Sequence, residues 1–341
     1  MSATQGDTTL SKKDFTSDRE VRWCPGCGDY AILSTVQSFL PELGIAPDDT
    51  VFVSGIGCSG RFTYYVDTYG MHGVHGRAPA LATGVATARP DLSVWVVTGD
   101  GDGLSIGGNH LIHALRRNVN LKILLFNNQI YGLTKGQYSP TSEEGKVTKS
   151  TPFGSVDHPF NPVALALGAE ATFVARSVDN DRAHLTEVLR RAAAHRGAAF
   201  VEIYQNCNVF NDGAFDLLRE KPQGTHNQIR LADGEPVIFD EGTRCVAVGP
   251  NGRLGVADVA DVRREDIVVH DAKGDPSLAF ALANIARGPH EPTCIGVFRD
   301  VERAVYGDAM LAQIEATTER LGRGTLASLL RSGDTWEVPA R

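Results

Sequence analysis

Short apolar runs that lack helical periodicity recur along the first two thirds of the chain. They are rich in β-branched and other large apolar residues, which is typical of strands buried in a sheet. Segments with the spacing of helices separate them. The expected strands are 51–54, 94–98, 121–126 and 199–204, and the expected helices include 80–88, 104–117 and 184–195. This alternation predicts an α/β fold with a doubly wound parallel sheet.

Changes in polarity suggest how the chain is divided. Residues 1–20 are polar and lack the apolar stretch of a secretory signal. Residues 132–163 are rich in Gly, Ser, Thr and Pro and are too long for a tight connection, which beside a cofactor is typical of a lid. Further on, short strand-like runs precede a helix near 309–322. We therefore expect a polar arm (1–20), a core domain (21–210) and an extension (211–341) that covers the core and contacts a partner.

Composition excludes several classes of protein. The chain has 341 residues, of which 42% are hydrophobic and 22% are charged, as expected of a globular protein. Its net charge of −8 argues against a nucleic-acid-binding surface, which needs clustered Lys and Arg. We find no uncharged apolar stretch of the ~18 residues that a membrane span requires. These features, together with the polar start of the chain, predict a cytoplasmic protein without a membrane or nucleic-acid partner.

The most informative local pattern is an acidic glycine turn, Gly99-Asp100-Gly101, between an expected strand and an expected helix. The free N–H groups and positive dipole of a helix N-terminus suit a phosphate, and glycine lets the backbone approach it closely. Asn127-Asn128 ends the next expected strand, so its amide oxygens should lie at the same edge of the sheet. A carboxylate, an amide oxygen and a backbone carbonyl are ligands that suit Mg²⁺ beside a diphosphate.

GDG, followed by 25 residues and then NN, resembles the fingerprint of thiamine diphosphate-binding proteins. The resemblance implies that Asp100, Asn128 and the backbone carbonyl of Ile130 hold Mg²⁺. It also implies that the sheet is of the diphosphate-domain type of those proteins. The residues that we expect to bind the cofactor are Gly57, Cys58, His72, Gly99, Asp100, Gly101, Asp102, Asn128, Ile130, Gly132 and Leu133.

Four of the six cysteines occur in loop-like settings that suit metal ligands. Cys24 and Cys27 flank a Pro-Gly pair in WCPGCG, a knuckle that can turn two thiolates toward one metal centre. Cys58 and Cys207 each follow an expected strand, and strand ends of one sheet can converge. The other two, Cys245 and Cys294, lie inside apolar strand-like runs and are expected to be buried free thiols.

Four thiolates fit either a structural zinc ion or an iron–sulfur cluster. A zinc knuckle usually has two short-spaced pairs, whereas one pair and two isolated cysteines favour a cluster. Together with the thiamine diphosphate pattern, this set resembles the β subunit of the 2-oxoacid:ferredoxin oxidoreductases over roughly residues 20–210. The resemblance implies a 4Fe-4S cluster held by Cys24, Cys27, Cys58 and Cys207 near the thiazolium ring.

Three segments make the chain most similar to the 2-oxoglutarate type of this family: WCPGCGDYAIL, GIGCSGRFTYY with HGVHGRAPALATG, and NNQIYGLTKGQYSPTS. A substrate with a distal carboxylate needs a countercharge, which Arg61 or Lys135 could supply; a solvated surface charge is the plain alternative for each. His72 and His75 could donate hydrogen bonds to cofactor or substrate, and Arg77 could contact the diphosphate. Ordinary packing is the alternative for these three. The residues expected to be catalytic are Arg61, Lys135 and His75.

The resemblance also implies an activity and partners. The reaction is the CoA-dependent oxidative decarboxylation of 2-oxoglutarate to succinyl-CoA and CO₂, possible in reverse, with electrons passed through the cluster to ferredoxin. Thiamine enzymes need a pyrimidine-binding domain, for which the chain leaves no obvious room, so an α subunit and a dimer of αβ pairs are expected. Three alternatives stay open: a non-redox thiamine lyase or synthase with zinc, a subunit without cofactors, and the same chemistry on pyruvate or another 2-oxo acid.

Overall fold

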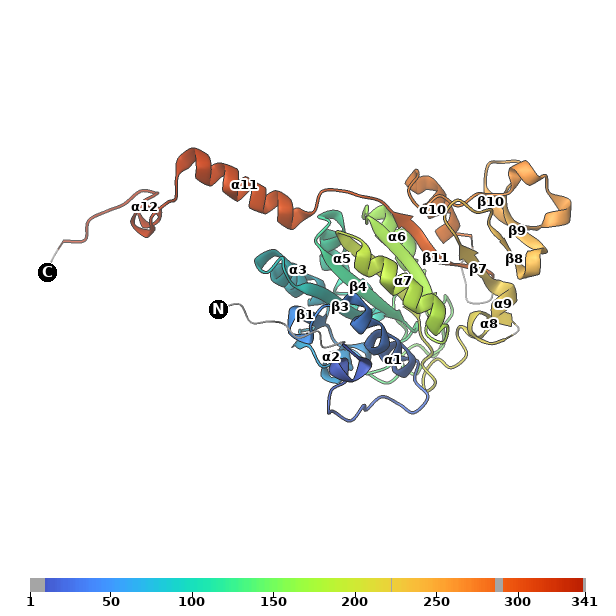
Figure 1. The fold of residues 1–341 in the computed structure, drawn as a ribbon. Helices are drawn as coiled ribbons and strands as arrows, with labels where there is room; N and C mark the ends of the chain where they lie inside the picture. Colours follow the sequence, from blue (N-terminus) through green and yellow to red (C-terminus); the bar gives the residue numbers. More distant parts are fainter. Residues whose placement is uncertain (1–9, 222, 286–290, 340–341) are drawn as a thin grey trace.

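An eight-stranded sheet forms the centre of the computed structural model, which describes residues 10–221, 223–285 and 291–339 (Figure 1). Its strand order is β2-β1-β3-β4-β6-β5-β11-β7. The four strands expected from the sequence form the adjacent block β1-β3-β4-β6, and each neighbouring pair is parallel. They are β1 (Thr50–Ser54), β3 (Ser93–Gly99), β4 (Leu121–Asn127) and β6 (Ala198–Tyr204).

Strands on either side of this block complete the sheet. β2 pairs in parallel with β1, β5 with β6 and β7 with β11, whereas β11 and β5 are antiparallel. The predicted α/β fold with a doubly wound sheet is confirmed, and the sheet is mixed because of that one antiparallel pair. The bounds are β2 (Tyr69–His72), β5 (Phe173–Val178), β7 (Gln228–Leu231) and β11 (Thr293–Asp300).

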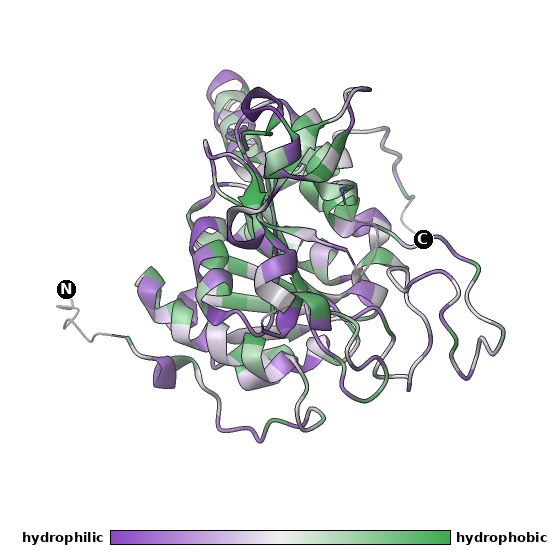
Figure 2. Ribbon diagram, turned by 90° about the vertical axis from the view of Figure 1, so that its right-hand side faces the viewer, coloured by the Kyte–Doolittle hydropathy of each residue, from purple (hydrophilic) through white to green (hydrophobic). Residues whose placement is uncertain are grey.

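Helices cover both faces of the sheet because successive strand residues point to opposite sides. In β3, Val94 and Val96 belong to one hydrophobic cluster, whereas Trp95 and Val97 belong to the other. Figure 2 shows hydrophobic residues concentrated along these central strands. The first cluster packs under α3 (Ala78–Ala88), α5 (Gly108–Arg116), α6 (Pro162–Gly168) and α10 (Pro276–Ala283), and the second under α1 (Asp29–Phe39) and α7 (Arg182–Ala194).

The prediction of one helix over 104–117 is wrong: two helices occur there, and the first begins earlier. A short helix, α4 (Asp100–Leu104), begins directly after β3 with Gly99 as its N-cap, so the acidic glycine turn is its first turn. The chain then leaves the helical conformation at Ser105 and resumes it in α5. A Cβ atom at Gly107 would lie 2.4 Å from the Asp102 carbonyl oxygen, so this break depends on glycine at a close backbone approach.

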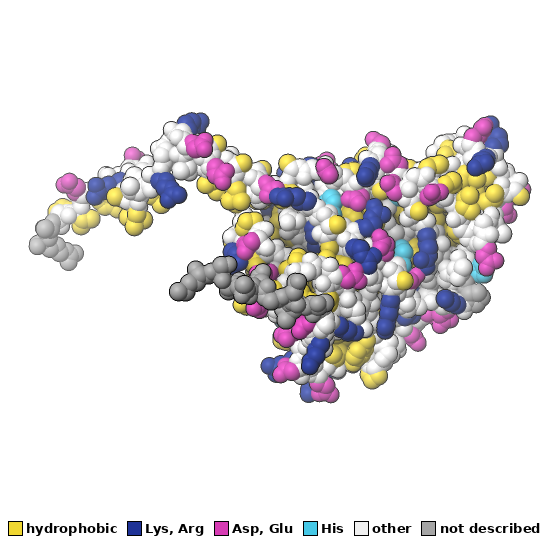
Figure 3. Space-filling model, in the orientation of Figure 1, with side chains coloured by type: hydrophobic (Ala, Val, Ile, Leu, Met, Phe, Trp, Pro, Cys, Tyr) yellow, Lys and Arg dark blue, Asp and Glu magenta, His cyan; other side chains and the backbone are white. Residues whose placement is uncertain are grey.

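Some residues beyond 210 form strands of the central sheet, and others form helices that project from the body of the molecule. β7 and β11 extend the sheet, and a separate antiparallel sheet lies beside it. The helices α11 and α12 project outward as an arm, along which hydrophobic side chains are visible (Figures 1 and 3). The predicted boundary at 210 stays a prediction. The remaining elements are α2 (Phe62–Tyr65), α8 (Asp216–Arg219), α9 (Gln223–Asn227), β8 (Ile238–Phe239), β9 (Arg244–Val248), β10 (Leu254–Asp258), α11 (Tyr306–Leu321) and α12 (Leu326–Leu330).

Part of the predicted N-terminal arm packs on the body. Residues 10–20 include a short 3-10 helix, Lys12–Phe15, whose Phe15 side chain is fully buried, while residues 1–9 lie outside the described part. Thr16 also forms an isolated bridge with Val66. Within the described residues, no helix is both long and apolar enough to cross a bilayer.

Candidate active site at the carboxyl ends of the strands

The carboxyl ends of β1, β3, β4 and β6 surround a cavity of about 130 Å³. This is the edge of an α/β sheet at which ligands bind. All of the expected cofactor-binding residues except His72 line it. They are joined by residues that the sequence analysis did not single out: Asp29, Ile56, Ser59, Phe126, Tyr131, Thr134 and Gln205.

Asp100 is the best-defined acidic group of this cavity. It is 2% exposed, and its Oδ2 accepts hydrogen bonds from Ser139 Oγ (2.5 Å) and Thr141 Oγ1 (2.6 Å). Burial raises the pKa of Asp100 to about 6, although the two hydroxyl groups favour the ionised form. Both hydroxyl groups come from the loop that was expected to act as a lid, so this loop packs against the acidic edge of the cavity.

The two asparagines at the carboxyl end of β4 have different surroundings. Asn127 is directed into the protein, where its Nδ2 donates to Glu202 Oε1 over 2.7 Å. Asn128 lines the cavity, and its Oδ1 accepts a hydrogen bond from the Ile130 N–H. Gln129, which follows Asn128, adopts a positive φ of 56°, which turns the chain at this point. Asp100, Asn128 and Ile130 therefore line one cavity, as the expected magnesium site requires, and their carboxylate, amide and carbonyl oxygens fit that hard cation.

Asp102 has a different role from Asp100 because hydrogen bonds occupy its carboxylate. Its Oδ1 accepts from His75 Nδ1 (2.6 Å), Gly76 N (2.7 Å) and Ile56 N (3.0 Å). Its Oδ2 accepts from Thr98 Oγ1 over 2.6 Å. Asp102 thus fastens two loops to the start of α4 and orients the His75 ring toward the cavity through its Nδ1 atom.

The cysteine loops converge on the same region. The Cys27 N–H donates to the Cys24 carbonyl within the knuckle, and Trp23 Nε1 donates to the Cys58 carbonyl over 2.7 Å. A Cβ atom at Gly132 would lie 3.4 Å from Cys58 Sγ and 3.7 Å from Cys207 Sγ. All four thiols are free, and two of them, Cys58 and Cys207, face the same glycine; the four-cysteine ligand set stays a prediction.

Burial disfavours the thiolate form in the cysteine loops. It raises the pKa of Cys58 to about 12, and it also raises the pKa of Cys27. The pKa of Cys294 in β11 is raised to about 12 for the same reason, so this shift does not by itself identify metal ligands. Among the described residues, no three His, Cys, Asp or Glu side chains stand close enough together to form a site for a single ion. Cys245 and Cys294 are buried in β9 and β11, as expected.

Comparisons with known proteins show which family the chain belongs to. The family model "Thiamine pyrophosphate enzyme, C-terminal TPP binding domain" matches residues 55–203. A 2-oxoglutarate oxidoreductase subunit KorB from Mycobacterium tuberculosis is 62% identical over 336 residues, which cover 97% of this chain and 90% of that protein. The chain belongs to the 2-oxoacid:ferredoxin oxidoreductase β-subunit family.

Other relatives of this β subunit extend the likeness. A 2-oxoacid:ferredoxin oxidoreductase subunit beta from Aeropyrum pernix is 46% identical over 199 residues, 58% of this chain and 64% of that protein. A solved 2-oxoglutarate:ferredoxin oxidoreductase from Magnetococcus marinus, with 2-oxoglutarate, coenzyme A and succinyl-CoA bound, superposes with a TM-score of 0.75. It is 33% identical, and the match covers 96% of this chain and 97% of that chain.

Several residues expected to act in this β subunit lie away from the cavity. His72 Nδ1 lies 2.9 Å from Ser54 Oγ and 3.1 Å from the Gly60 carbonyl oxygen, which holds its ring beside β1. His72 and Arg61 instead line a neighbouring cavity of about 590 Å³. Lys135 is exposed and lines neither cavity.

Two of the expected cationic groups have backbone partners that suggest a role. Arg61 Nη1 donates to the Arg22 carbonyl, which ties the Cys58 loop to the segment before the cysteine knuckle. Arg77 Nη1 donates to the His75 carbonyl over 3.0 Å, so in this structure it supports the His75 loop. The catalytic roles of Arg61, Lys135 and His75 stay predictions.

Three buried polar residues of the cavity, Asp29, Ser59 and Gln205, were not among the expected site residues, and two of them have atoms without partners. Asp29 is 1% exposed, and neither of its carboxyl oxygens has a hydrogen-bond partner; Gln205 Oε1 also has none. Burial raises the pKa of Asp29 to about 7. Two sequence signals were available: Asp29 follows the WCPGCG knuckle directly, and Gln205 stands at the carboxyl end of a strand, two residues before Cys207.

Proposed function

We propose that this chain is the β subunit of a 2-oxoglutarate:ferredoxin oxidoreductase, which converts 2-oxoglutarate and CoA to succinyl-CoA and CO₂ and passes the electrons to ferredoxin. One observation carries the proposal: a single cavity at the carboxyl edge of the sheet joins Asp100, Asn128 and Ile130 to the thiols around Gly132. A thiamine site and a metal–sulfur site in contact are what this redox reaction needs, because electrons must pass from one to the other.

Asp100, Asn128 and the Ile130 carbonyl would hold Mg²⁺, and the first turn of α4 would face the diphosphate. Thiamine diphosphate, when bound, supplies the nucleophilic carbon and the electron sink for decarboxylation of a 2-oxo acid. The protein side of the mechanism is positioning. Ser139 and Thr141 fix the Asp100 carboxylate, and Asp102 fixes the His75 ring at the wall of the same cavity.

Cys24, Cys27, Cys58 and Cys207 would hold a 4Fe-4S cluster, which when bound accepts electrons one at a time. Cys58 lines the thiamine cavity itself, so the proposed electron path from this cavity to the cluster is short. A reducing compartment, the cytoplasm, suits the six free cysteines.

The proposed partners are an α subunit that completes the thiamine site, ferredoxin, and the substrates 2-oxoglutarate and CoA, in a dimer of αβ pairs. The projecting arm supports a partner chain, because it exposes large apolar residues that isolated soluble proteins rarely display together. They include Leu311, Ile314, Leu321, Leu326, Leu329 and Leu330.

The test is to purify the chain with its α subunit in the absence of oxygen and to record visible absorption and EPR spectra. We expect a brown complex whose cluster is reduced by 2-oxoglutarate with CoA and not by pyruvate. Reduction by pyruvate, without reduction by 2-oxoglutarate, would contradict the proposed substrate. A colourless complex that contains zinc would contradict the redox chemistry and support a non-redox thiamine enzyme instead.

A second experiment tests the predicted countercharges. In Arg61→Leu and Lys135→Leu variants we expect a higher KM for 2-oxoglutarate and a weaker preference for it over pyruvate. Exposed Lys149 offers a matched control, Lys149→Leu, which should leave both values unchanged. Unchanged values in the first two variants would exclude those charges from substrate binding.

A further inference from the structure

Gln205 is a buried amide held in one position beside the cysteine knuckle. It directly follows β6 and is 1% exposed, and its backbone N–H donates to the Asn127 carbonyl over 2.9 Å. The side chain packs against the knuckle: a Cβ atom at Gly28 would lie 2.9 Å from Gln205 Cγ. The amide therefore has little freedom to move away from Cys27.

The contacts of the amide fix which way it faces. Its nitrogen, Nε2, lies 2.6 Å from the Asn206 carbonyl oxygen and 3.2 Å from Cys27 Sγ. Only the NH₂ group can donate to a carbonyl, because an amide oxygen in that place would face another oxygen. The second N–H of the same group points to the sulfur, and Oε1 remains without a partner in a residue that lines the thiamine cavity.

We infer that Gln205 is a positioning residue that raises the reduction potential of the cluster held by Cys27, through an N–H···S hydrogen bond. The inference rests on the proposed function, which supplies the cluster. A hydrogen bond to a ligand sulfur withdraws negative charge and favours the reduced state, which carries one more electron. Because the amide is neutral, it does this without changing the charge of the site, and no proton is gained or lost.

The test is a potentiometric titration of the anaerobic αβ complex, followed by EPR. Gln205→Met keeps the length and volume of the side chain but removes both donors. We expect a midpoint potential more negative than that of the wild type, with unchanged iron and sulfide content. Gln37→Met is the matched control: Gln37 is also buried and donates to a carbonyl, that of Tyr65 over 2.8 Å, but it does not line the cavity. Its potential should equal that of the wild type.

A brown Gln205→Met complex with the wild-type potential would overturn the inference and leave the proposed function intact. A colourless wild-type complex that contains zinc would overturn both. If Gln205→Met fails to assemble, the wild type itself provides the test. Pulsed EPR of the reduced complex, labelled with ¹⁵N in the glutamine side chains, should detect an amide nitrogen coupled to the cluster. Absence of that coupling would overturn the inference.

Discussion

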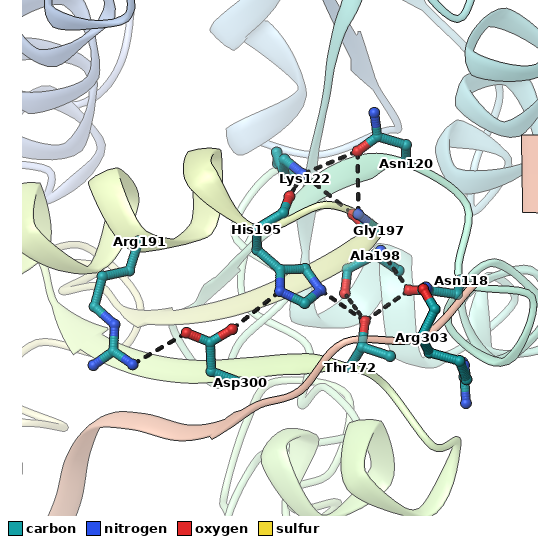
Figure 4. A network of polar contacts seen from close by, with 10 residues as sticks. All are labelled: Asn118, Asn120, Lys122, Thr172, Arg191, His195, Gly197, Ala198, Asp300 and Arg303. Atoms are coloured by element: carbon teal, nitrogen blue, oxygen red, sulfur yellow. Dashed lines mark hydrogen bonds and ion pairs between the residues drawn. The ribbon is translucent and has the colours of Figure 1, made fainter. Parts of the chain in front are cut away.

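Two clusters of polar side chains lie at opposite ends of the same strands, and they differ in how completely their atoms are paired. At the amino ends, Asn118, Thr172 and His195 belong to a network in which no buried side-chain atom is left without a partner (Figure 4). At the carboxyl ends, the Asp29 carboxyl and Gln205 Oε1 are buried and unpaired. Because an unpaired buried group costs about 1–3 kcal/mol, the first cluster stabilises the fold and the second is suited to receive a ligand.

The amino-end network fastens the C-terminal segment to the sheet. Thr172 Oγ1 donates to Asn118 Oδ1 over 2.6 Å and lies 2.8 Å from His195 Nε2. His195 Nδ1 lies 3.1 Å from Asp300 Oδ1, and Asn118 Nδ2 donates to the Arg303 carbonyl over 3.0 Å. The chain that leaves β11 is therefore bound to the starts of β4, β5 and β6 before it continues into the projecting arm.

The largest expected effect on metal content and activity comes from substitution in the cysteine loops. Cys207→Ser should reduce the iron content to near zero and lower the rate of ferredoxin reduction by more than about a hundredfold. Mutation of a residue that hydrogen-bonds to a metal ligand usually lowers activity by about 10- to 100-fold, and loss of the ligand itself should lower it further. Metal analysis and the ferredoxin-reduction assay measure these changes. Cys245→Ser changes a cysteine far from the cavity and should retain the cluster; loss of iron there as well would argue against the assigned ligands.

The next largest effect is expected at Asp100, where substitution should change cofactor binding but not the stability of the fold. Asp100→Asn should weaken binding of thiamine diphosphate with Mg²⁺ by about a hundredfold, or about 2.7 kcal/mol, because the metal loses its charged ligand. The free energy of unfolding without cofactor should not fall, since burial already disfavours the charge of Asp100. Calorimetric titration and urea unfolding measure the two quantities. A large loss of stability with unchanged cofactor binding would show that Asp100 stabilises the fold and does not bind the metal.

At the amino ends the opposite pattern is expected. Thr172→Val preserves shape but removes the hydroxyl between Asn118 and His195, which should lower the free energy of unfolding by about 1–3 kcal/mol. Urea unfolding gives this value. The affinity for thiamine diphosphate should stay that of the wild type, and a tenfold weaker affinity would show that the two clusters are coupled.

The smallest effect is a pH dependence at Asp300. Hydrogen bonding to His195, together with Arg191, keeps the pKa of Asp300 below its ordinary value of 3.8. Its ionised form therefore stabilises the fold above that value, and the stabilisation is lost as the pH falls through the lower pKa of the folded state. Asp300→Asn should cost about 1 kcal/mol at pH 7, and this difference from the wild type should shrink only below about pH 4. A constant difference would exclude the charge as its source.

The sequence predicted those parts of the site that follow from the ends of strands. GDG at the end of β3, NN at the end of β4 and Cys207 shortly after β6 were expected at one edge of a parallel sheet, and they lie there. The break at Ser105, the hydrogen bonds of Asp102 and the orphaned atoms of Asp29 were not predictable, because they depend on loops from distant parts of the chain. The sequence also could not show whether Lys135 faces a cavity, since that depends on the path of its loop.

Gly132 has a consequence for how the protein is assembled. Only three residues separate it from Asn128, so one short stretch of backbone carries the expected magnesium ligand and also faces the thiols of Cys58 and Cys207. A segment this short spans no more than about 14 Å even when fully extended, so the two expected sites lie close together. In biosynthetic terms, we expect insertion of the proposed metal–sulfur centre and loading of thiamine diphosphate to be linked steps of maturation, because both involve this segment.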